Sequence, residues 1–221
     1  MTEWRRLSDR TVQYAPIALR PIDDFTADSP IVETTFVLDR KVGTRWVETG
    51  IEAVRTPSGL TIWPGLGRVR FVAAEPVAKY RVRFADPNSL GIYRPAFAFA
   101  LDGLEFDVAS WNDTNPPASL PDTPALVYLY PGVSYPFPKS VPLLRGRTVD
   151  AANNPLANAL VTGGTDNVVS DERGGFALPI RLSASPNSIV VTAEHQRSNT
   201  AGDVTVSLPG GLATAVDIQL I

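Results

Sequence analysis

The chain has 221 residues, of which 44% are hydrophobic and 19% are charged, and its formal net charge is −3. This composition supplies a buried core and excludes an intrinsically disordered chain, and the balanced charge gives no electrostatic reason to expect nucleic-acid binding. The absence of cysteine excludes disulfides and thiolate chemistry, and 20 prolines with 16 glycines favour short strands and turns over long helices.

Residues 1–13 are polar and charged, and Trp4 and Leu7 are their apolar anchors. The pattern predicts a loose N-terminal arm or a short helix, or alternatively an arm that packs on a neighbouring subunit. This start lacks the apolar run of a signal peptide, and no stretch approaches the ~18 apolar residues of a membrane span. We therefore expect a product made in the cytoplasm without a signal peptide, and the missing cysteines favour folding in that reducing compartment.

A first domain is expected over residues 14–138, because short β-favouring runs alternate there with turn residues. Thr56-Pro-Ser-Gly59 is a turn with glycine where a positive φ is needed. Trp46 and Trp63 are expected in the core of this domain. The expected strands comprise residues 31–38, 44–48, 51–55, 60–63 and 79–85.

The second half of this domain contains a predicted β-hairpin, in which Asp102-Gly103 is the turn between strands at 93–101 and 104–108. Residues 112–124 form a Pro-rich insertion, which is typical of a surface loop. A strand at 125–130 and a stiff Pro-rich linker at 131–138 follow, so the domain boundary is expected near residues 138–143.

The most informative stretch is in the C-terminal third. Residues 144–161 indicate two strands around a turn at Asn153-Asn154-Pro155, because Asn tolerates positive φ and Pro cannot donate to a β-ladder. Residues 168–178 indicate a hairpin, with Asp171-Glu-Arg-Gly-Gly175 as its loop. Further strands are expected at 188–194 and 215–221.

Two segments carry a resemblance: Gly146 to Val161, with Thr148-Val-Asp150 and Asn154-Pro-Leu-Ala-Asn-Ala, and Ser170-Asp-Glu-Arg-Gly-Gly-Phe-Ala-Leu178. Residues 143–221 resemble the carboxypeptidase regulatory-like domain, a small transthyretin-like (prealbumin-like) β-sandwich. Asn154 stands where that family usually has Gly, and Asn158 where it has a small residue. The resemblance implies the fold and says almost nothing about function, because such modules accompany many unrelated proteins.

The order of segments in the first domain repeats this pattern. Residues 19–32 parallel 144–157, residues 54–63 parallel 169–178, and residues 79–84 parallel 188–193. We interpret this as a diverged duplication, although short alternating strands also resemble one another by chance. The predicted fold is all-β, with two tandem small antiparallel β-sandwiches (prealbumin-like or immunoglobulin-like) joined by a Pro-rich linker.

The sequence predicts no catalytic residues, no cofactor and no metal. A catalytic zinc site commonly uses several histidines, and His195 is the only one in the chain, where we expect it in a solvated loop. No nucleophile elbow or phosphate-binding glycine motif occurs. The neighbouring carboxylates Asp23, Asp24 and Asp28 could bind calcium, but capping of a turn is the expected role. The other acidic pairs are Asp102 with Glu105 and Asp171 with Glu172.

The aromatic residues in the second half of the first domain are the remaining candidates. They could form a platform that stacks on sugars, belong to the core, or anchor protein–protein contacts. Residues 135–138 beside the linker favour interdomain packing or a partner contact. The candidate contact residues are Trp111, Tyr128, Tyr130, Tyr135 and Phe137.

We expect a non-enzymatic structural subunit of a phage tail, baseplate or tail-like particle, because such parts combine β-sandwich modules with the absence of signal peptide and disulfides. It would be incorporated into a virion or extracellular particle as part of an oligomeric assembly, with other protein subunits as partners. Exposed sheet edges and residues 93–137 would be its contact surfaces. The alternatives are a surface adhesion or carbohydrate-binding module and an enzyme of unrecognised type.

Overall fold

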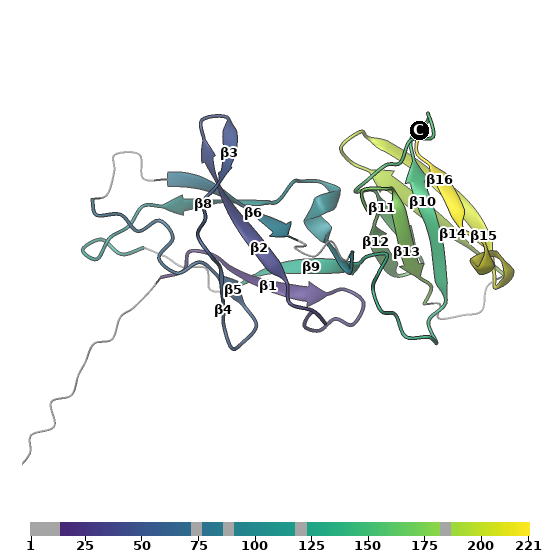
Figure 1. The fold of residues 1–221 in the computed structure, drawn as a ribbon, viewed down its shortest axis with the longest axis horizontal. Coiled ribbons are helices and arrows are strands. Elements are labelled where there is room, and N and C mark those ends of the chain that lie inside the picture. Colours follow the sequence, from purple (N-terminus) through teal and green to yellow (C-terminus); the bar gives the residue numbers. More distant parts are fainter. Residues whose placement is uncertain (1–13, 72–76, 86–90, 118–122, 182–186) are drawn as a thin grey trace, which may run out of the picture.

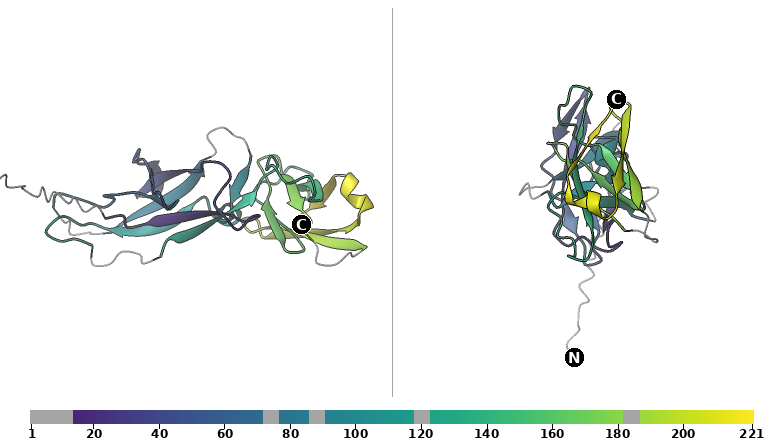
Figure 2. Two further views of the ribbon diagram at one scale, coloured as in Figure 1. Left: turned by 90° about the horizontal axis from the view of Figure 1, so that it is seen from below. Right: turned by 90° about the vertical axis from the view of Figure 1, so that its right-hand side faces the viewer.

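The computed structural model describes residues 14–71, 77–85, 91–117, 123–181 and 187–221. The expected N-terminal arm at 1–13 and part of the expected Pro-rich loop, at 118–122, lie outside these residues. The described residues form sixteen strands and two short 3₁₀ helices, which confirms the all-β prediction. Figures 1 and 2 show the strands gathered into two sandwiches that lie end to end along the long axis of the molecule.

The first module contains two facing sheets around one apolar core, whose fully buried members include Leu19, Leu38, Trp63, Val82 and Leu129. In one sheet the strand order is β4 (Val54–Arg55), β5 (Thr61–Ile62), β1 (Ala18–Asp23), β9 (Ala125–Pro131) and β7 (Tyr93–Pro95). In the other sheet it is β3 (Arg45–Glu48), β2 (Thr35–Val42), β6 (Val77–Ala85) and β8 (Leu104–Ala109).

The second module has its own core, which includes Leu144, Val161, Leu178, Val191 and Ile218. One sheet has the order β13 (Gly175–Pro179), β10 (Leu143–Val149) and β16 (Val216–Gln219). The other has the order β12 (Asp166–Val169), β11 (Leu160–Gly163), β14 (Ser188–His195) and β15 (Thr200–Ser207). Along β14 exposed and buried residues alternate, as the period of a strand with one face on the core requires.

The two modules share one connectivity. In each, the first strand pairs in parallel with the last strand of the module, β1 with β9 and β10 with β16. In each, a hairpin follows the first strand, and its first arm pairs with the next long strand, β2 with β6 and β11 with β14. The segments that the sequence pairs across the two halves therefore occupy equivalent places in the two folds.

A turn in each module repeats this equivalence at the level of single hydrogen bonds. The Thr56 N–H donates to the Leu60 carbonyl, and the Leu60 N–H donates back to the Thr56 hydroxyl. In the second module the Asp171 N–H donates to the Gly175 carbonyl, and the Gly175 N–H donates to the Asp171 carboxylate. One side-chain oxygen thus closes the same turn in both modules, as Asp and Thr commonly do.

Residues 93–108 do not form the hairpin predicted from Asp102-Gly103. Strand β7 pairs with β9, whereas β8 pairs with β6 in the opposite sheet, so the segment crosses the sandwich. A 3₁₀ helix, η1 (Ala96–Phe99), begins directly after Pro95 and packs Phe97 against the core. An Asp-Gly turn motif does not indicate which sheet the following strand joins. Strands β7, β8 and β9 are integral members of the two sheets of the sandwich.

Candidate interaction surfaces and the module junction

The predicted contact residues are divided between the core and the surface. Trp111 and Tyr135 are 4% and 7% exposed, so neither is available to a partner. The Trp111 indole N–H donates to the Leu66 carbonyl at 2.8 Å, and its ring meets Tyr14 edge to face. Phe137 is half-buried and packs against Phe25 and Tyr135. These three aromatic residues therefore serve the packing of the first module.

Tyr128 remains on the surface, where 43% of it is exposed on the outer face of β9. Leu126 lies two residues earlier on the same face and is 50% exposed. In the parallel register Ile22 of β1 stands opposite Tyr128, and Tyr130 continues the row towards the second module. Leu126, Tyr128 and Tyr130 thus form a small apolar and aromatic strip on this sheet.

The acidic cluster at the end of β1 caps a turn. The Asp23 carboxylate is fully buried and accepts hydrogen bonds from the N–H groups of Phe25 and Thr26. Its other oxygen accepts the hydroxyls of Tyr93 at 2.6 Å and Tyr135 at 2.7 Å. Its lone pairs are therefore occupied by donors of the chain, and turn capping is the role that the geometry supports.

This buried carboxylate also fixes the linker. Tyr93 belongs to β7 and Tyr135 to the Pro-rich segment after β9, so one side chain ties three separate segments together. Burial, followed by the hydrogen bond to Asp23, raises the pKa of both tyrosines, which keeps them protonated as donors. The segment that connects the two modules is consequently anchored to the first module.

Arg181 of the second module reaches into the first. Its guanidinium donates to the Phe25 carbonyl at 2.8 Å and lies 4.5 Å from the centroid of the Phe25 ring. On its own side it forms an ion pair with the buried Asp166, whose carboxylate oxygen accepts from Arg181 Nε at 2.7 Å. A cation held over an aromatic face by a fixed carboxylate is a specific, directional contact.

Two further arginines bridge the modules. Arg94 on β7 pairs with Glu172, in the turn between β12 and β13, and this hydrogen bond holds the pKa of Glu172 below its ordinary value. Arg197, after β14, donates to Asp102 at 2.7 Å and to the Ala98 carbonyl at 3.0 Å. With Arg181, these residues form what we call the arginine junction. Burial at this junction is the main cause that raises the pKa of Asp24.

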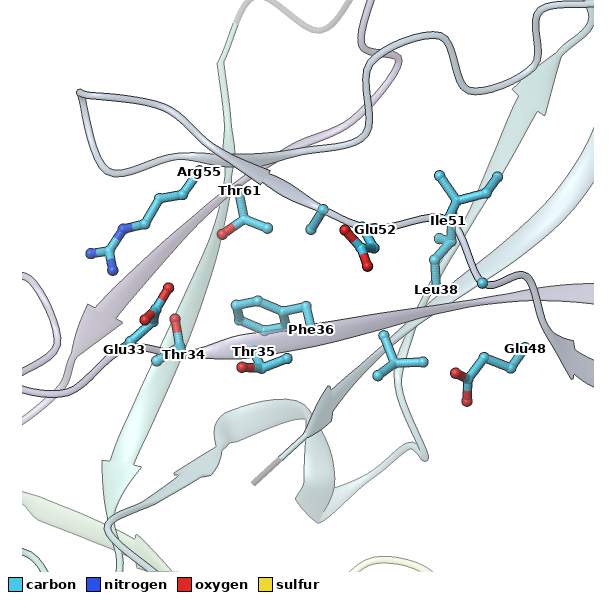
Figure 3. A pocket seen from close by; sticks show the side chains of 13 residues that line it. Glu33, Thr34, Thr35, Phe36, Leu38, Glu48, Ile51, Glu52, Arg55 and Thr61 are labelled. Atoms are coloured by element: carbon cyan, nitrogen blue, oxygen red, sulfur yellow. The ribbon is translucent and has the colours of Figure 1, made fainter. Parts of the chain in front are cut away.

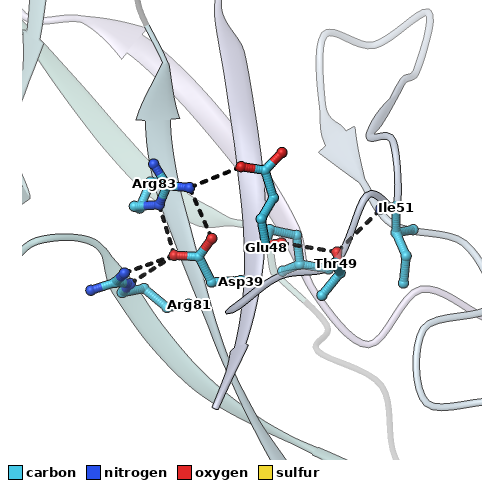
Figure 4. Close-up of polar contacts among 7 residues, drawn as sticks. Asp39, Glu48, Thr49, Ile51, Arg81 and Arg83 are labelled. Carbon is cyan, nitrogen blue, oxygen red and sulfur yellow. Dashed lines mark hydrogen bonds and ion pairs between the residues drawn. The ribbon is translucent and has the colours of Figure 1, made fainter. Parts of the chain in front are cut away.

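A second polar network covers the outer face of the other sheet (Figure 4). The Asp39 carboxylate, 2% exposed, accepts from Arg81 at 2.7 Å and from Arg83 at 2.7 and 2.9 Å. Arg83 continues to Glu48 at 3.3 Å. Burial alone would raise the pKa of Asp39, but the hydrogen bonds from Arg83 and Arg81 outweigh it and lower that pKa.

Trp46 and His195 differ from their expected settings. Trp46 lies half-buried on the outer face of β3, with the Arg81 guanidinium 4.7 Å from its ring centroid, and not in the core. His195 is the last residue of β14 and only 9% exposed, so it is not a solvated loop residue. Its Nδ1 lies 2.6 Å from the Ser198 hydroxyl, and burial lowers its pKa. Trp63 is fully buried, as predicted.

Among the residues that the structure describes, no three His, Cys, Asp or Glu side chains are grouped closely enough to hold a metal ion. Within the same residues, no helix has the length and apolarity to cross a membrane. The Asp39 network was not predictable because charged residues on alternate strand positions ordinarily indicate a solvated face. The arginine junction was not predictable because it depends on how the two modules meet. For the Asp39 network, the alternating residues Arg81 and Arg83 were the available signal, and Arg81 stands opposite Asp39 in the sheet register.

The fold defines the class of protein: an all-β chain of two β-sandwich modules. No family model matches the chain, and no curated protein sequence matches it. Among solved structures, the Bacillus anthracis TIE protein matches over 95% of this chain, with 12% identity and a TM-score of 0.28, and this chain spans 34% of it. The C-terminal fragment of the pilus adhesin SpaC from Lactobacillus rhamnosus GG matches over 95% of this chain and 97% of its own, with 13% identity and a TM-score of 0.23.

Proposed function

We propose that this protein is a non-enzymatic structural subunit, a stiff two-module spacer that acts through protein–protein contacts in a phage tail, baseplate or tail-like particle. The observation that carries the proposal is the arginine junction. Three arginines cross between the modules, and each contacts a carboxylate or a backbone carbonyl on the other side. A hinge between independent domains would need no such set of directional contacts.

The anchored linker supports the same role. Tyr135 packs in the first core and donates to Asp23, so the chain between the modules adds little freedom of its own. Prolines in the same segment restrict the backbone further. A subunit that must transmit position between its partners gains from such a fixed geometry, whereas an enzyme with a cleft between domains gains from motion.

The experiment is to express the chain together with the products of its flanking genes and to measure the mass of the purified species. We expect a stable complex or a ring of defined copy number in which this chain is stoichiometric. A chain that stays monomeric and binds none of those products would contradict the proposal. The charge-reversing variant Arg181→Glu, matched by Arg145→Glu on the exposed face of β10, separates loss of the junction from a general charge effect.

A second candidate, a surface adhesion or carbohydrate-binding module, is favoured by the strip in which Leu126 and Tyr128 are exposed and Tyr130 is half-buried. An aromatic ring on a flat sheet face offers a stacking surface for a sugar. Glycan-array binding by the wild-type chain that is lost in Tyr128→Ala would support it. Binding that is unchanged in Tyr128→Ala, or absent from the wild type, would rule this strip out as a sugar site.

A further inference from the structure

The first module has a groove between its two sheets that the sequence analysis did not anticipate (Figure 3). Its volume is about 490 Å³, and it lies between β2 and the chain segment at residues 50–55. Phe36, Leu38 and Ile51 supply apolar lining, while Glu33, Glu52 and Arg55 supply charge. In Figure 3, the Phe36 ring lies between β2 and the facing segment.

The groove exists because the first module has extra chain at this point. Strand β12 of the second module corresponds to β3 of the first. In the second module β12 ends at Val169 and the turn that follows begins at Asp171, whereas in the first module β3 ends at Glu48 and the equivalent turn begins only at Thr56. The hairpin ladder stops at Thr49, whose N–H and hydroxyl both donate to the Leu38 carbonyl at 2.9 Å. Gly50, with φ of +66°, then turns the chain away from β2.

Because the chain turns away at Gly50, no strand of the described chain pairs with the first residues of β2 on the side opposite β6. The Leu38 carbonyl faces the β3 side, where it accepts from Thr49. Because backbone groups alternate along a strand, the N–H and C=O groups of Phe36 face the same side, into the groove, and Thr34, just before β2, also lines it. An open edge beside an apolar floor is the geometry in which an extended segment adds as a strand.

The surroundings of the groove are apolar and acidic. Ile51, which lines the groove, is 45% exposed, and Val54, in the facing segment at residues 50–55, is 48% exposed. Within the described chain neither Glu33 nor Glu52 forms an ion pair, and Glu48 is shared with Arg83. With Arg55 as the single cation of the lining, the groove favours an occupant that combines apolar and basic side chains.

The N-terminal 13 residues of this chain have that composition. They contain Arg5, Arg6 and Arg10 beside Trp4, Leu7 and Val12, with Glu3 and Asp9 as their acidic residues. The described chain begins at Tyr14, whose carbonyl accepts from the Gly65 N–H and whose ring meets Trp111. Trp111 follows β8, the edge strand at the opposite side of the sheet from β3. The described chain therefore begins beside Gly65 and Trp111, neither of which lines the groove.

We propose that residues 1–13 of one copy add as a strand to the open edge of β2 in a second copy, with Arg side chains near Glu33 and Glu52. This inference rests on the proposed function in one respect, because it names a contact by which copies of the subunit would assemble. It can fail while the chain still binds other particle proteins, so the two tests give separate answers.

The experiment uses full-length chains, in which the absence of native cysteine allows single cysteines to be placed at will. One preparation carries Leu7→Cys, and the other carries Thr34→Cys in the groove. The two are mixed and treated with a flexible bis-maleimide. The matched control replaces Thr34→Cys by Val190→Cys, which lies on the exposed face of the second module at 54% exposure. A second arm measures self-association of wild type, of E33R/E52R and of R5E/R6E/R10E by sedimentation.

We expect crosslinked pairs to form at least tenfold more with Thr34→Cys than with Val190→Cys. Each charge-reversed variant should self-associate at least tenfold more weakly than wild type, and a mixture of the two should regain association. Equal crosslinking at both sites, or a wild type that stays monomeric up to high concentration, would overturn the proposal. Crosslinking between positions 7 and 34 within one doubly substituted chain, without crosslinking between chains, would also overturn it.

Discussion

Gly59 and Gly174 occupy the same position in the equivalent turns of the two modules, with φ of +81° and +72°. Their surroundings differ. A Cβ atom on Gly59 would meet nothing within 4 Å, whereas a Cβ atom on Gly174 would lie 2.4 Å from the Thr148 carbonyl oxygen. The turn chemistry is thus common to both modules, but only the second packs this turn against its first strand.

The difference predicts unequal costs for the same substitution. Gly59→Ala should destabilise by about 1 kcal/mol, since only the left-handed backbone conformation is strained. Gly174→Ala should cost about 3 kcal/mol or more, because the backbone of β10 must also move. Urea unfolding with probes in each module measures both values. Equal losses would show that the turn of the second module is not packed as described.

The Asp39 network predicts a stability effect with a matched control. Asp39→Asn should destabilise the first module by about 3 kcal/mol, because it leaves Arg81 and Arg83 without their shared buried carboxylate. Asp107→Asn, in the same sheet at 59% side-chain exposure, should change stability by less than about 0.5 kcal/mol. Chemical denaturation of both variants provides the comparison, and similar values would contradict the role of burial.

The lowered pKa of Asp39 also sets the direction of a pH effect. In the unfolded chain an aspartate takes up its proton near pH 4, and in the folded chain it does so at lower pH. The stabilisation is therefore fully present above about pH 4 and is lost as the pH falls through the folded pKa. Asp39→Asn should remove this part of the acid sensitivity, and an unchanged acid profile would count against the network.

Removal of the Tyr135 hydroxyl should lower the stability of the first module beside the linker. Tyr135→Phe should destabilise the first module by about 2 kcal/mol, because Asp23 stays buried with one donor fewer. Tyr128→Phe, on the exposed face of β9, should be nearly neutral. Thermal unfolding of both variants measures the difference. A neutral Tyr135→Phe would indicate that Asp23 does not depend on this donor.

Substitution of Arg181 should change the relative position of the two modules more than the folding stability of either one. Arg181→Lys keeps a cation beside Asp166 but loses the planar group that lies over Phe25 and donates to its carbonyl. Combined with Asp102→Ala, it should broaden the distribution of particle dimensions in small-angle scattering while each module unfolds within about 1 kcal/mol of wild type. An unchanged distribution would locate the stiffness in the linker or in the remaining Arg94–Glu172 pair.

Much of the fold was predictable because local chemistry specifies it. Most of the predicted runs and glycine turns correspond to observed strands and turns. Within residues 51–55 and 93–101, however, only the short strands β4 and β7 form, and β12 and β13, predicted as the two arms of one hairpin, lie in different sheets. The parallel closing strands were not predictable, since pairing of β1 with β9 joins residues more than a hundred positions apart. The crossing at residues 96–103 was missed for the same reason, because an Asp-Gly pair indicates a turn but not which sheet follows.

The interaction surfaces were less accessible to sequence reasoning. Tyr128 lies on the surface while Trp111 and Tyr135 lie in the core, although aromatic composition alone treats all three alike. Side-chain direction decides between these outcomes, and it depends on the register of the sheet. The arginine junction depends in addition on how two modules meet, which no single segment encodes.

The fixed relation of the two modules is the central claim, and a distance distribution tests it most directly. Val42 in the first module and Val190 in the second are both exposed. Spin labels attached at Val42→Cys and Val190→Cys report the distance between these two sites by pulsed electron paramagnetic resonance. The structure predicts one narrow distance in the wild type and a broad distribution when Arg181→Lys and Asp102→Ala are added. A broad distribution in the wild type itself would contradict a stiff spacer.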